Sequence, residues 1–142
     1  MLFVYYCTMY SFETKVRVRY GETDQMGFVY YGVYAQYYEV GRVELLRSLG
    51  ISYKKIEDMG FALPVVSMKI QYKKPALYDD NLVVKTTIKE IPESTRITFH
   101  YEIYNERSEL LNFGEVVLVF LNKETKKPCI VPKVILEKLN LI

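Results

Sequence analysis

Hydrophobic and polar residues alternate along five stretches of this chain, and a period of two predicts β-strands with one buried face. The stretches are residues 12–20, 61–73, 82–91, 95–104 and 111–121. The apolar face of the first ends with Tyr20; that of the second comprises Val66, Met68, Ile70 and Tyr72. Pro64 indicates a bulge or a sheet edge. Residues 111–121 are hydrophobic on both faces apart from Glu115, so we expect a central strand there.

A different period governs residues 33–49, where one apolar face recurs at the spacing of a buried α-helix. That face is formed by Tyr34, Tyr37, Tyr38, Gly41, Leu45 and Leu49. The opposite, polar face is formed by Gln36, Glu39, Arg42 and Arg47. Gly50 follows, where a helix C-terminus commonly needs a positive φ. Shorter helices are expected over residues 52–59, with Ser52 as N-cap, and over 133–139 after Pro132.

These elements predict an α+β fold. The links between the last four strands have the length of hairpins, so the strands are expected to pair antiparallel. A long apolar helix needs a sheet to bury it, and the alternation offers one apolar sheet face. We therefore expect a long central helix packed on a curved five-stranded antiparallel sheet. With no repeat or linker, residues 1–142 are interpreted as a single domain.

Composition narrows the function classes. The net charge is +2, and the tyrosines have no basic groove beside them, which disfavours nucleic-acid binding. Cys7 and Cys129 form no disulfide framework, so a reduced, cytoplasmic protein is expected. With His100 as the one histidine, we expect no metal site, and no cofactor is indicated. No apolar run reaches the roughly 18 residues of a membrane span.

Residues 1–10 are interpreted as an N-terminal extension. The stretch up to residue 8 is apolar, but it is short and has no basic residues, so it is not interpreted as a signal peptide. It fits either an extension ahead of a start at Met9 or an extra edge strand.

Asp24 is the main candidate for chemistry. It lies in an aperiodic, glycine-containing loop just before the long helix. A helix N-terminus presents unpaired N–H groups and a partial positive charge. A carboxylate beside such an end suits acyl transfer, in which an oxyanion must be stabilised. The alternative, which the residues alone leave open, is an aspartate that caps a turn.

Other charged residues have competing interpretations. Glu39 and Glu44 are rival carboxylates, or partners of Arg42 and Arg47 at spacing i,i+3. His100 is expected on the outward face of its strand, as a surface residue. The lysines of the densest basic cluster either contact phosphates or cover a solvated strand face: Lys69, Lys73 and Lys74.

Three segments together resemble the hotdog-fold thioesterases, in particular the 4-hydroxybenzoyl-CoA thioesterase family and related short-chain acyl-CoA thioesterases. They are YGETDQMGFVYY at residues 20–31, the helix over 34–46, and YKKPALYDDNL at 72–82. The resemblance implies that Asp24 is the catalytic carboxylate and that the Tyr31 backbone N–H polarises the thioester carbonyl. It also implies that Leu63, Pro64 and Val65 line the thioester channel. CoA thioesters would bind at a subunit interface, with two chains joined edge to edge in a homodimer or homotetramer.

The sequence departs from that family at three places. Tyr31 and Val33 stand where the short-chain branch usually has histidine and often asparagine, and residues 92–94 lack the paired arginines of one branch. A backbone N–H role at Tyr31 survives these changes.

The expected function is hydrolysis of an acyl-CoA thioester, with Asp24 as nucleophile or general base. The alternative is a non-catalytic hotdog module that binds an acyl-CoA or acyl-carrier chain. A hotdog dehydratase or isomerase would need an active-site histidine, which His100 does not supply. The acyl group, and the choice between CoA and acyl carrier protein, stay open.

Overall fold

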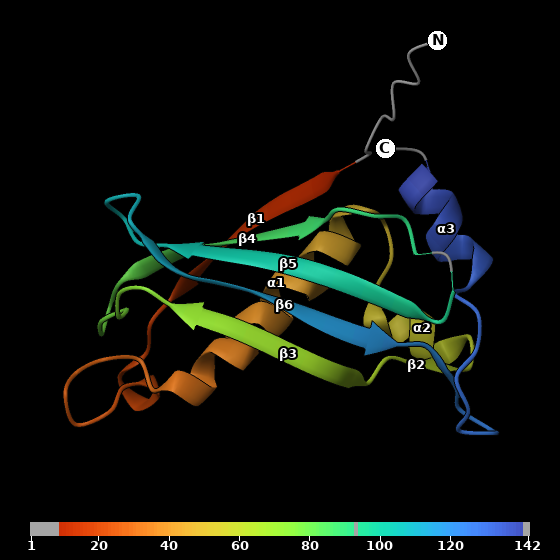
Figure 1. The fold of residues 1–142 in the computed structure, drawn as a ribbon, viewed down its shortest axis with the longest axis horizontal. Helices are drawn as coiled ribbons and strands as arrows, with labels where there is room; N and C mark the ends of the chain where they lie inside the picture. The colour runs from red at the N-terminus through yellow and green to blue at the C-terminus, as the bar shows by residue number, and fades with distance from the viewer. Residues whose placement is uncertain (1–8, 93, 141–142) are drawn as a thin grey trace, which may run out of the picture.

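The computed structural model describes residues 9–92 and 94–140, so the interpretations of residues 1–8 lie outside the described residues. One antiparallel sheet contains five strands in the order β1-β4-β5-β6-β3 (Figure 1). The strands are β1 (Tyr10–Arg17), β3 (Val65–Tyr72), β4 (Asn81–Ile88), β5 (Arg96–Tyr104) and β6 (Leu110–Val119).

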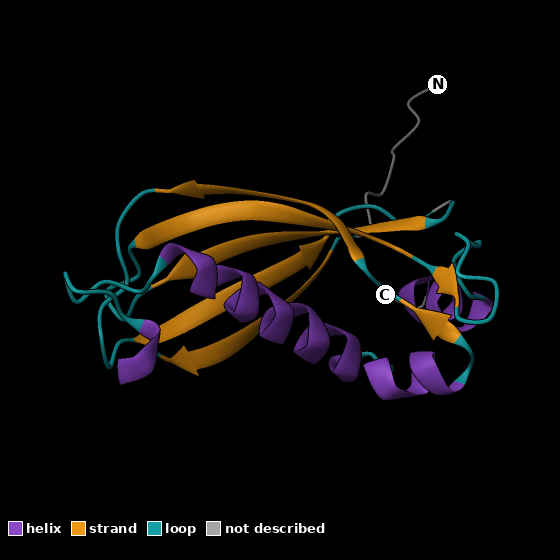
Figure 2. Ribbon diagram, turned by 90° about the horizontal axis from the view of Figure 1, so that it is seen from below, coloured by secondary structure: helices purple, strands orange, loops and turns teal. Residues whose placement is uncertain are grey.

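The long helix α1 (Tyr34–Ser48) lies along the concave side of the sheet, as Figure 2 shows. A 3₁₀ turn, η2 (Tyr31–Val33), leads directly into it. The helix buries the predicted face almost as expected: Tyr34, Tyr37, Tyr38, Gly41 and Leu45 are all buried. The expected hotdog arrangement of one central helix on a curved sheet is confirmed.

Gly41 is the point of closest approach between α1 and the sheet. A Cβ atom built there would lie 2.4 Å from Thr86 Oγ1 and 2.9 Å from Val84 Cγ1. Only glycine leaves room for strand β4 at this distance. Nearby, the rings of Tyr38 and Tyr101 are stacked with their centroids 4.0 Å apart. The helix and the sheet therefore pack closely here, because aromatic rings stack between them and Gly41 has no side chain to separate them.

The prediction that Arg42 lies on the exposed polar face of the helix was wrong, because its side chain is buried. Its Nε donates to the Tyr53 hydroxyl at 3.0 Å. That bond comes from the next helix, α2 (Tyr53–Asp58), which a helical period within residues 33–49 cannot reveal. Ser52 caps α2 as predicted, with its Oγ accepting from the Lys55 N–H at 3.1 Å.

The first predicted strand is too long. β1 ends at Arg17, and Tyr20 begins a short 3₁₀ turn, η1 (Tyr20–Glu22), with its side chain 79% exposed. The carboxylate of Glu22 accepts the Arg19 N–H at 2.8 Å, which closes this turn and ends the ladder. The prediction that Tyr20 faces inward was wrong.

The predicted strand over residues 61–73 is divided at Leu63 and Pro64, in agreement with the break expected at the proline. The first part, β2 (Phe61–Ala62), pairs with β7 (Leu121–Asn122) in a separate two-stranded sheet. The second part, β3, is an edge strand whose apolar side chains are largely exposed, including Val65, Val66, Met68 and Tyr72.

The centre of the sheet is β5 rather than β6, which lies between β5 and the edge strand β3. Any interior strand has neighbours on both sides, so its hydrophobicity alone cannot rank it within the sheet. The last helix, α3 (Lys133–Asn140), and α2 lie at the opposite end of the molecule from the loop that precedes α1 (Figure 1). Among the described residues, no helix has the length and apolar character needed to span a membrane.

Candidate active site

The Asp24 side chain closes the loop that leads to α1. Its Oδ1 accepts hydrogen bonds from the backbone N–H groups of Met26 at 2.9 Å and Phe28 at 3.2 Å. The Asp24 N–H donates to the Phe28 carbonyl at 2.7 Å, and Gly27 has the positive φ of 78° that the turn needs. The turn-capping alternative is therefore correct for one carboxylate oxygen. Within the described part of the chain Oδ2 has no hydrogen bond and remains available for chemistry.

Asp24 and Tyr31 line the same open pocket of about 320 Å³ at one end of the sheet. The other lining residues are Phe28, Val29, Tyr34, Tyr72, Lys73, Lys74 and Pro75. The pocket thus brings together the loop, the start of the helical segment and the end of β3. All three segments of the family resemblance, residues 20–31, 34–46 and 72–82, therefore contribute to this pocket, the helix only with its first residue, Tyr34.

The backbone N–H of Tyr31 is the first of the continuous helical segment formed by η2 and α1. Such an N–H has no intrahelical acceptor and lies at the positive end of the helix dipole. The Tyr31 carbonyl accepts a hydrogen bond from the Tyr72 hydroxyl at 3.3 Å, which ties the helix start to the edge strand. An anionic oxygen in the pocket would be stabilised at this position.

The floor of the pocket is held by Tyr34. Its hydroxyl accepts the Ala76 N–H at 3.2 Å, and its ring lies 5.6 Å from that of Tyr72. The Val29 N–H in turn donates to the Ala76 carbonyl at 2.9 Å. Burial raises the pKa of Tyr34, so its hydroxyl stays protonated at neutral pH. The segment after β3 is therefore fastened to the Asp24 loop, which explains why both carry parts of one motif.

Comparison with known proteins identifies the family. The model of the thioesterase-like superfamily matches residues 18–139. The chain belongs to the thioesterase-like superfamily. It is 35% identical to the acyl-CoA thioester hydrolase YbgC of Escherichia coli, over 86% of this chain and 90% of that protein.

Solved structures give the same result for this thioesterase. DHNA-CoA thioesterase from Staphylococcus aureus superposes with a TM-score of 0.81 and 36% identity, covering 84% of this chain and 80% of that one. Slr0204, a 1,4-dihydroxy-2-naphthoyl-CoA thioesterase from Synechocystis, superposes with a TM-score of 0.84 and 27% identity, covering 92% and 96%. The resemblance drawn from the sequence motifs is confirmed.

Of the three lysines considered for phosphate contact, Lys73 and Lys74 reach the rim of the thioesterase pocket, but each already has a neighbour. Lys74 forms an ion pair with Glu109, and the Lys73 ammonium lies 5.7 Å from the centroid of the Phe113 ring. Hydrogen bonds from Lys74, Arg107 and Asn105 lower the pKa of Glu109 to about 2, so this carboxylate is ionised at neutral pH. A phosphate bound by Lys74 would compete with Glu109.

The predicted channel residues are not beside Asp24 in a single chain. Val65 and Tyr72 are the two ends of β3, which at about 3.3 Å per residue lie more than 20 Å apart. Val65 lines a second hollow of about 290 Å³, together with Ala35, Gln36, Glu39, Arg42, Met68 and Val116. Leu63 and Pro64 precede Val65, at the same end of the strand.

The rival carboxylates are also separate from the Asp24 pocket. Glu39 lies in the second hollow, and the expected pair with Arg42 is not among the ion pairs of the described residues. Glu44 forms an ion pair with Arg47 on the helix surface, as predicted.

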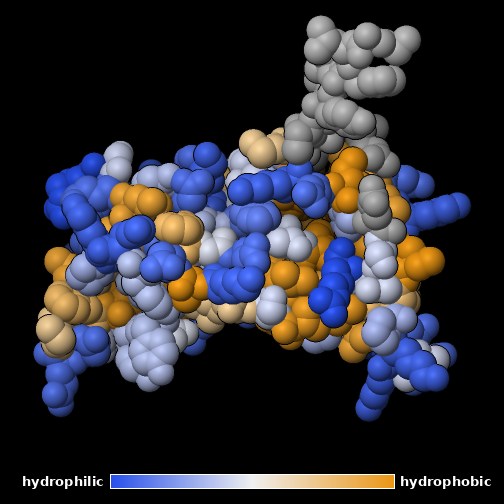
Figure 3. All heavy atoms as spheres, viewed as in Figure 1, coloured by the Kyte–Doolittle hydropathy of each residue, from blue (hydrophilic) through white to orange (hydrophobic). Residues whose placement is uncertain are grey.

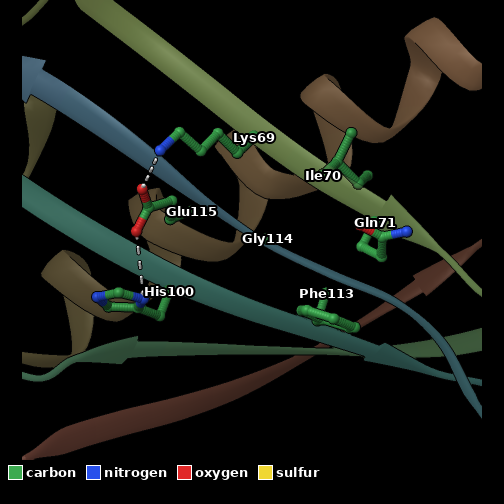
Figure 4. Close-up of a pocket in the computed structure, with 7 residues that line it drawn as sticks. All are labelled: Lys69, Ile70, Gln71, His100, Phe113, Gly114 and Glu115. Atoms are coloured by element: carbon green, nitrogen blue, oxygen red, sulfur yellow. Dashed lines mark ion pairs between the residues drawn. The ribbon is translucent and has the colours of Figure 1, made fainter.

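His100 and Lys69 lie on the outer face of the sheet, away from α1 (Figure 4). Glu115 stands between them, with Oε1 3.8 Å from Lys69 Nζ and Oε2 3.9 Å from His100 Nδ1. Burial and the nearby Lys89 lower the pKa of His100, although Glu115 and Glu90 oppose them. Figure 3 views this face and shows hydrophilic side chains spread among apolar ones. The surface interpretation of His100 and the solvated-face interpretation of Lys69 agree with this position.

Three aromatic residues of the pocket were not predicted as site residues: Phe28, Tyr34 and Tyr72. Tyr34 was assigned to the buried helix face and Tyr72 to the apolar face of a strand. The spacing of residues says which face a side chain occupies, but not that two such faces meet beside a loop. Among the described residues, no group of three or more His, Cys, Asp or Glu side chains could hold a metal ion.

Proposed function

We propose that this thioesterase hydrolyses acyl-CoA thioesters to a free acid and CoA, with Asp24 as nucleophile or general base. The observation that carries the proposal is the pocket shared by the Asp24 carboxylate and the helix start at Tyr31. The names of the similar proteins support acyl-CoA as the substrate class.

The chemistry follows from the two groups. The thioester carbonyl oxygen would accept a hydrogen bond from the Tyr31 N–H, where the helix dipole favours the developing negative charge. Asp24 Oδ2 would attack the carbonyl carbon, releasing CoA thiolate and leaving a mixed anhydride for water to hydrolyse. Alternatively, Oδ2 would take a proton from the attacking water. One oxyanion donor of this kind contributes about 3 kcal/mol to the stabilisation of the transition state.

The active unit we propose is a homodimer, or a dimer of such dimers, joined through β3. This edge strand exposes unpaired backbone groups and the apolar side chains of Val65, Val66 and Met68, which pairing with a second copy would cover. Antiparallel pairing about a twofold axis would set the Val65 end of one β3 against the Tyr72 end of the other. Leu63, Pro64 and Val65 of the second copy would then line the thioester channel beside Asp24.

The decisive test is the variant Asp24→Asn on a panel of acyl-CoAs, with released thiol as the measurement. Asparagine retains an Oδ1 acceptor for the Met26 and Phe28 N–H groups, so the turn should persist. We expect kcat to fall at least about 100-fold, the lower range for positioned acid–base catalysis, with little change in KM. The melting temperature should change little, because Asp24 is exposed.

The matched control is Asp58→Asn, an exposed carboxylate of α2 at the far end of the molecule. It should keep wild-type kcat. An Asp24→Asn enzyme with near wild-type kcat would refute the role of Asp24 and direct attention to Glu39 and Glu44. Wild-type protein that binds acyl-CoA without releasing thiol would instead support the non-catalytic module.

A further inference from the structure

Glu22 is a buried carboxylate that the proposed mechanism does not use. Its relative exposure is 9%, and within the described residues no other acidic side chain is buried. Its Oε1 accepts hydrogen bonds from the Arg19 N–H at 2.8 Å and from the Tyr37 hydroxyl at 2.9 Å. Its Oε2 accepts from Arg19 Nη2 at 3.2 Å. A carboxylate is costly to bury, so such a set of donors indicates a defined role.

The backbone of Glu22 fastens the other side of the catalytic loop. Its carbonyl accepts the N–H of Tyr30, the residue directly before Tyr31, at 2.9 Å. The next residue, Thr23, forms an antiparallel bridge with Val29. Glu22 and Thr23 therefore close the base of the loop whose tip is the Asp24 turn. The side chain of Glu22 connects that base to α1 through Tyr37.

Tyr37 continues the connection into the pocket. Its ring contacts that of Tyr34 edge to face, with the centroids 5.9 Å apart. Tyr34 lines the pocket and lies against Tyr72, which holds the Tyr31 carbonyl. Two routes thus run from Glu22 to the reacting groups, one through the loop backbone to Asp24 and one through three tyrosines to the helix start.

We infer that Glu22 is a positioning residue of the thioesterase: through Tyr37 it fixes the Asp24 loop in register with the N–H of Tyr31. The inference rests on the proposed function, because it concerns the distance between the proposed nucleophile or base and the proposed oxyanion donor. Misplacement of a catalytic group by about 1 Å costs as much as 100-fold in rate. The binding groups of the pocket rim do not depend on Glu22, so its loss should act on kcat.

The test compares Glu22→Gln and Tyr37→Phe with the wild-type enzyme in a thiol-release assay. We expect Glu22→Gln to lower kcat about 10- to 100-fold and to change KM less than about 3-fold. Tyr37→Phe removes one donor and leaves the charge, so its loss of kcat should be smaller. The double variant should lose less than the product of the two single effects, because both weaken one contact, the first by removing the charge of its acceptor and the second by removing its donor.

The control for general destabilisation is Ser52→Ala, which removes the N-cap of α2 at the far end of the molecule. It should lower the melting temperature while leaving kcat and KM unchanged. If Glu22→Gln retains wild-type kcat, the inference is wrong. It is also wrong if the two variants have equal melting temperatures and Glu22→Gln loses no more kcat than Ser52→Ala. If Glu22→Gln does not fold, Tyr37→Phe decides alone: wild-type kcat in that variant would overturn the inference.

The outcomes separate the inference from the function on which it rests. Wild-type enzyme that releases no thiol from any acyl-CoA overturns the proposed function, and the role of Glu22 falls with it. An active wild-type enzyme, an inactive Asp24→Asn variant and an unaffected Glu22→Gln variant would overturn the inference alone.

Discussion

Gly41→Ala should destabilise the protein, although alanine is the better helix former. The added Cβ would lie 2.4 Å from Thr86 Oγ1 and 2.9 Å from Val84 Cγ1, closer than atoms can approach without movement. Both neighbours are fully buried, as is Tyr101 beside them, so none can withdraw toward solvent. Extra volume in such a site costs about 1–3 kcal/mol.

Two terms oppose each other in this variant. Replacing glycine inside a helix gains up to about 1 kcal/mol. With overpacking near the upper part of its range, the net loss in the free energy of unfolding is about 1–2 kcal/mol. For a chain of this length that corresponds to a fall of about 3–8 °C in the melting temperature. Thermal unfolding at one protein concentration is the measurement, since association with a second copy would make the temperature concentration-dependent.

The second variant, Thr86→Ala, removes the obstructing atom. Within the described residues Thr86 Oγ1 has no hydrogen-bond partner, so its loss relieves an unpaired buried hydroxyl while the lost methyl group costs about 1 kcal/mol. The single variant should therefore be close to wild type. The double variant should recover most of the loss caused by Gly41→Ala, with a coupling energy of about 1–2 kcal/mol. Additive effects, or a Gly41→Ala variant as stable as wild type, would refute the close contact.

Three further outcomes can be measured. Lys73→Ala combined with Lys74→Ala should raise KM for acyl-CoA with kcat nearly unchanged, and raised salt should reproduce part of this effect on the wild-type enzyme. The control Lys69→Ala, on the outer face of the sheet, should leave KM unchanged. If the double variant has the wild-type KM, all three lysines return to the solvated-face interpretation. Light scattering at micromolar concentration should give at least twice the chain mass of 16.8 kDa, and a monomer would contradict the shared site. Burial raises the pKa of Glu22, but hydrogen bonds from Arg19 and Tyr37 outweigh it and hold the pKa below its usual value. The stability advantage of wild type over Glu22→Gln should therefore be full at pH 7 and shrink as the pH falls below about 4.5; a constant difference would contradict the ionised, hydrogen-bonded carboxylate.

The sequence predicts best those elements that pack along their whole length against one surface, because that surface imposes a regular hydrophobic period. The face of α1 from Tyr34 to Leu45 and the inward residues of β4 and β5 follow the sheet–helix contact, which every turn and every second residue repeats. Asp24 and Tyr31 were predicted as site residues from the family motif; the structure shows that both line one pocket, and their roles stay a prediction.

The incorrect predictions come from contacts that a hydrophobic period does not describe. Arg42 is buried because one hydroxyl on another helix, that of Tyr53, receives its Nε–H. Tyr20 leaves the strand because the Glu22 carboxylate captures the Arg19 N–H. The side chains of β3 have the alternation of a half-buried strand, yet they are largely exposed because β3 lies at the edge of the sheet, where no further strand among the described residues pairs with it. The Tyr53 hydroxyl lies outside the stretch over which the helical period is read, and the position of β3 in the sheet is set by pairing between distant strands. The Glu22 contact is local, but it ends the alternation of the strand and so cannot be read from it.

The two oxygens of the Asp24 carboxylate are held differently: Oδ1 accepts two backbone hydrogen bonds, whereas Oδ2, the oxygen that we propose reacts, accepts none within the described residues. Because a carboxylate is planar, the two N–H groups that hold Oδ1 also fix the direction in which Oδ2 presents its lone pairs. The rotational freedom of this carboxylate, the proposed reactive group, is thus removed when the loop folds, before any substrate arrives. A glutamate at this position could not keep both: its extra methylene would carry the carboxylate away from the Met26 and Phe28 N–H groups. The proposed chemistry therefore depends on the length of the Asp24 side chain as well as on its charge.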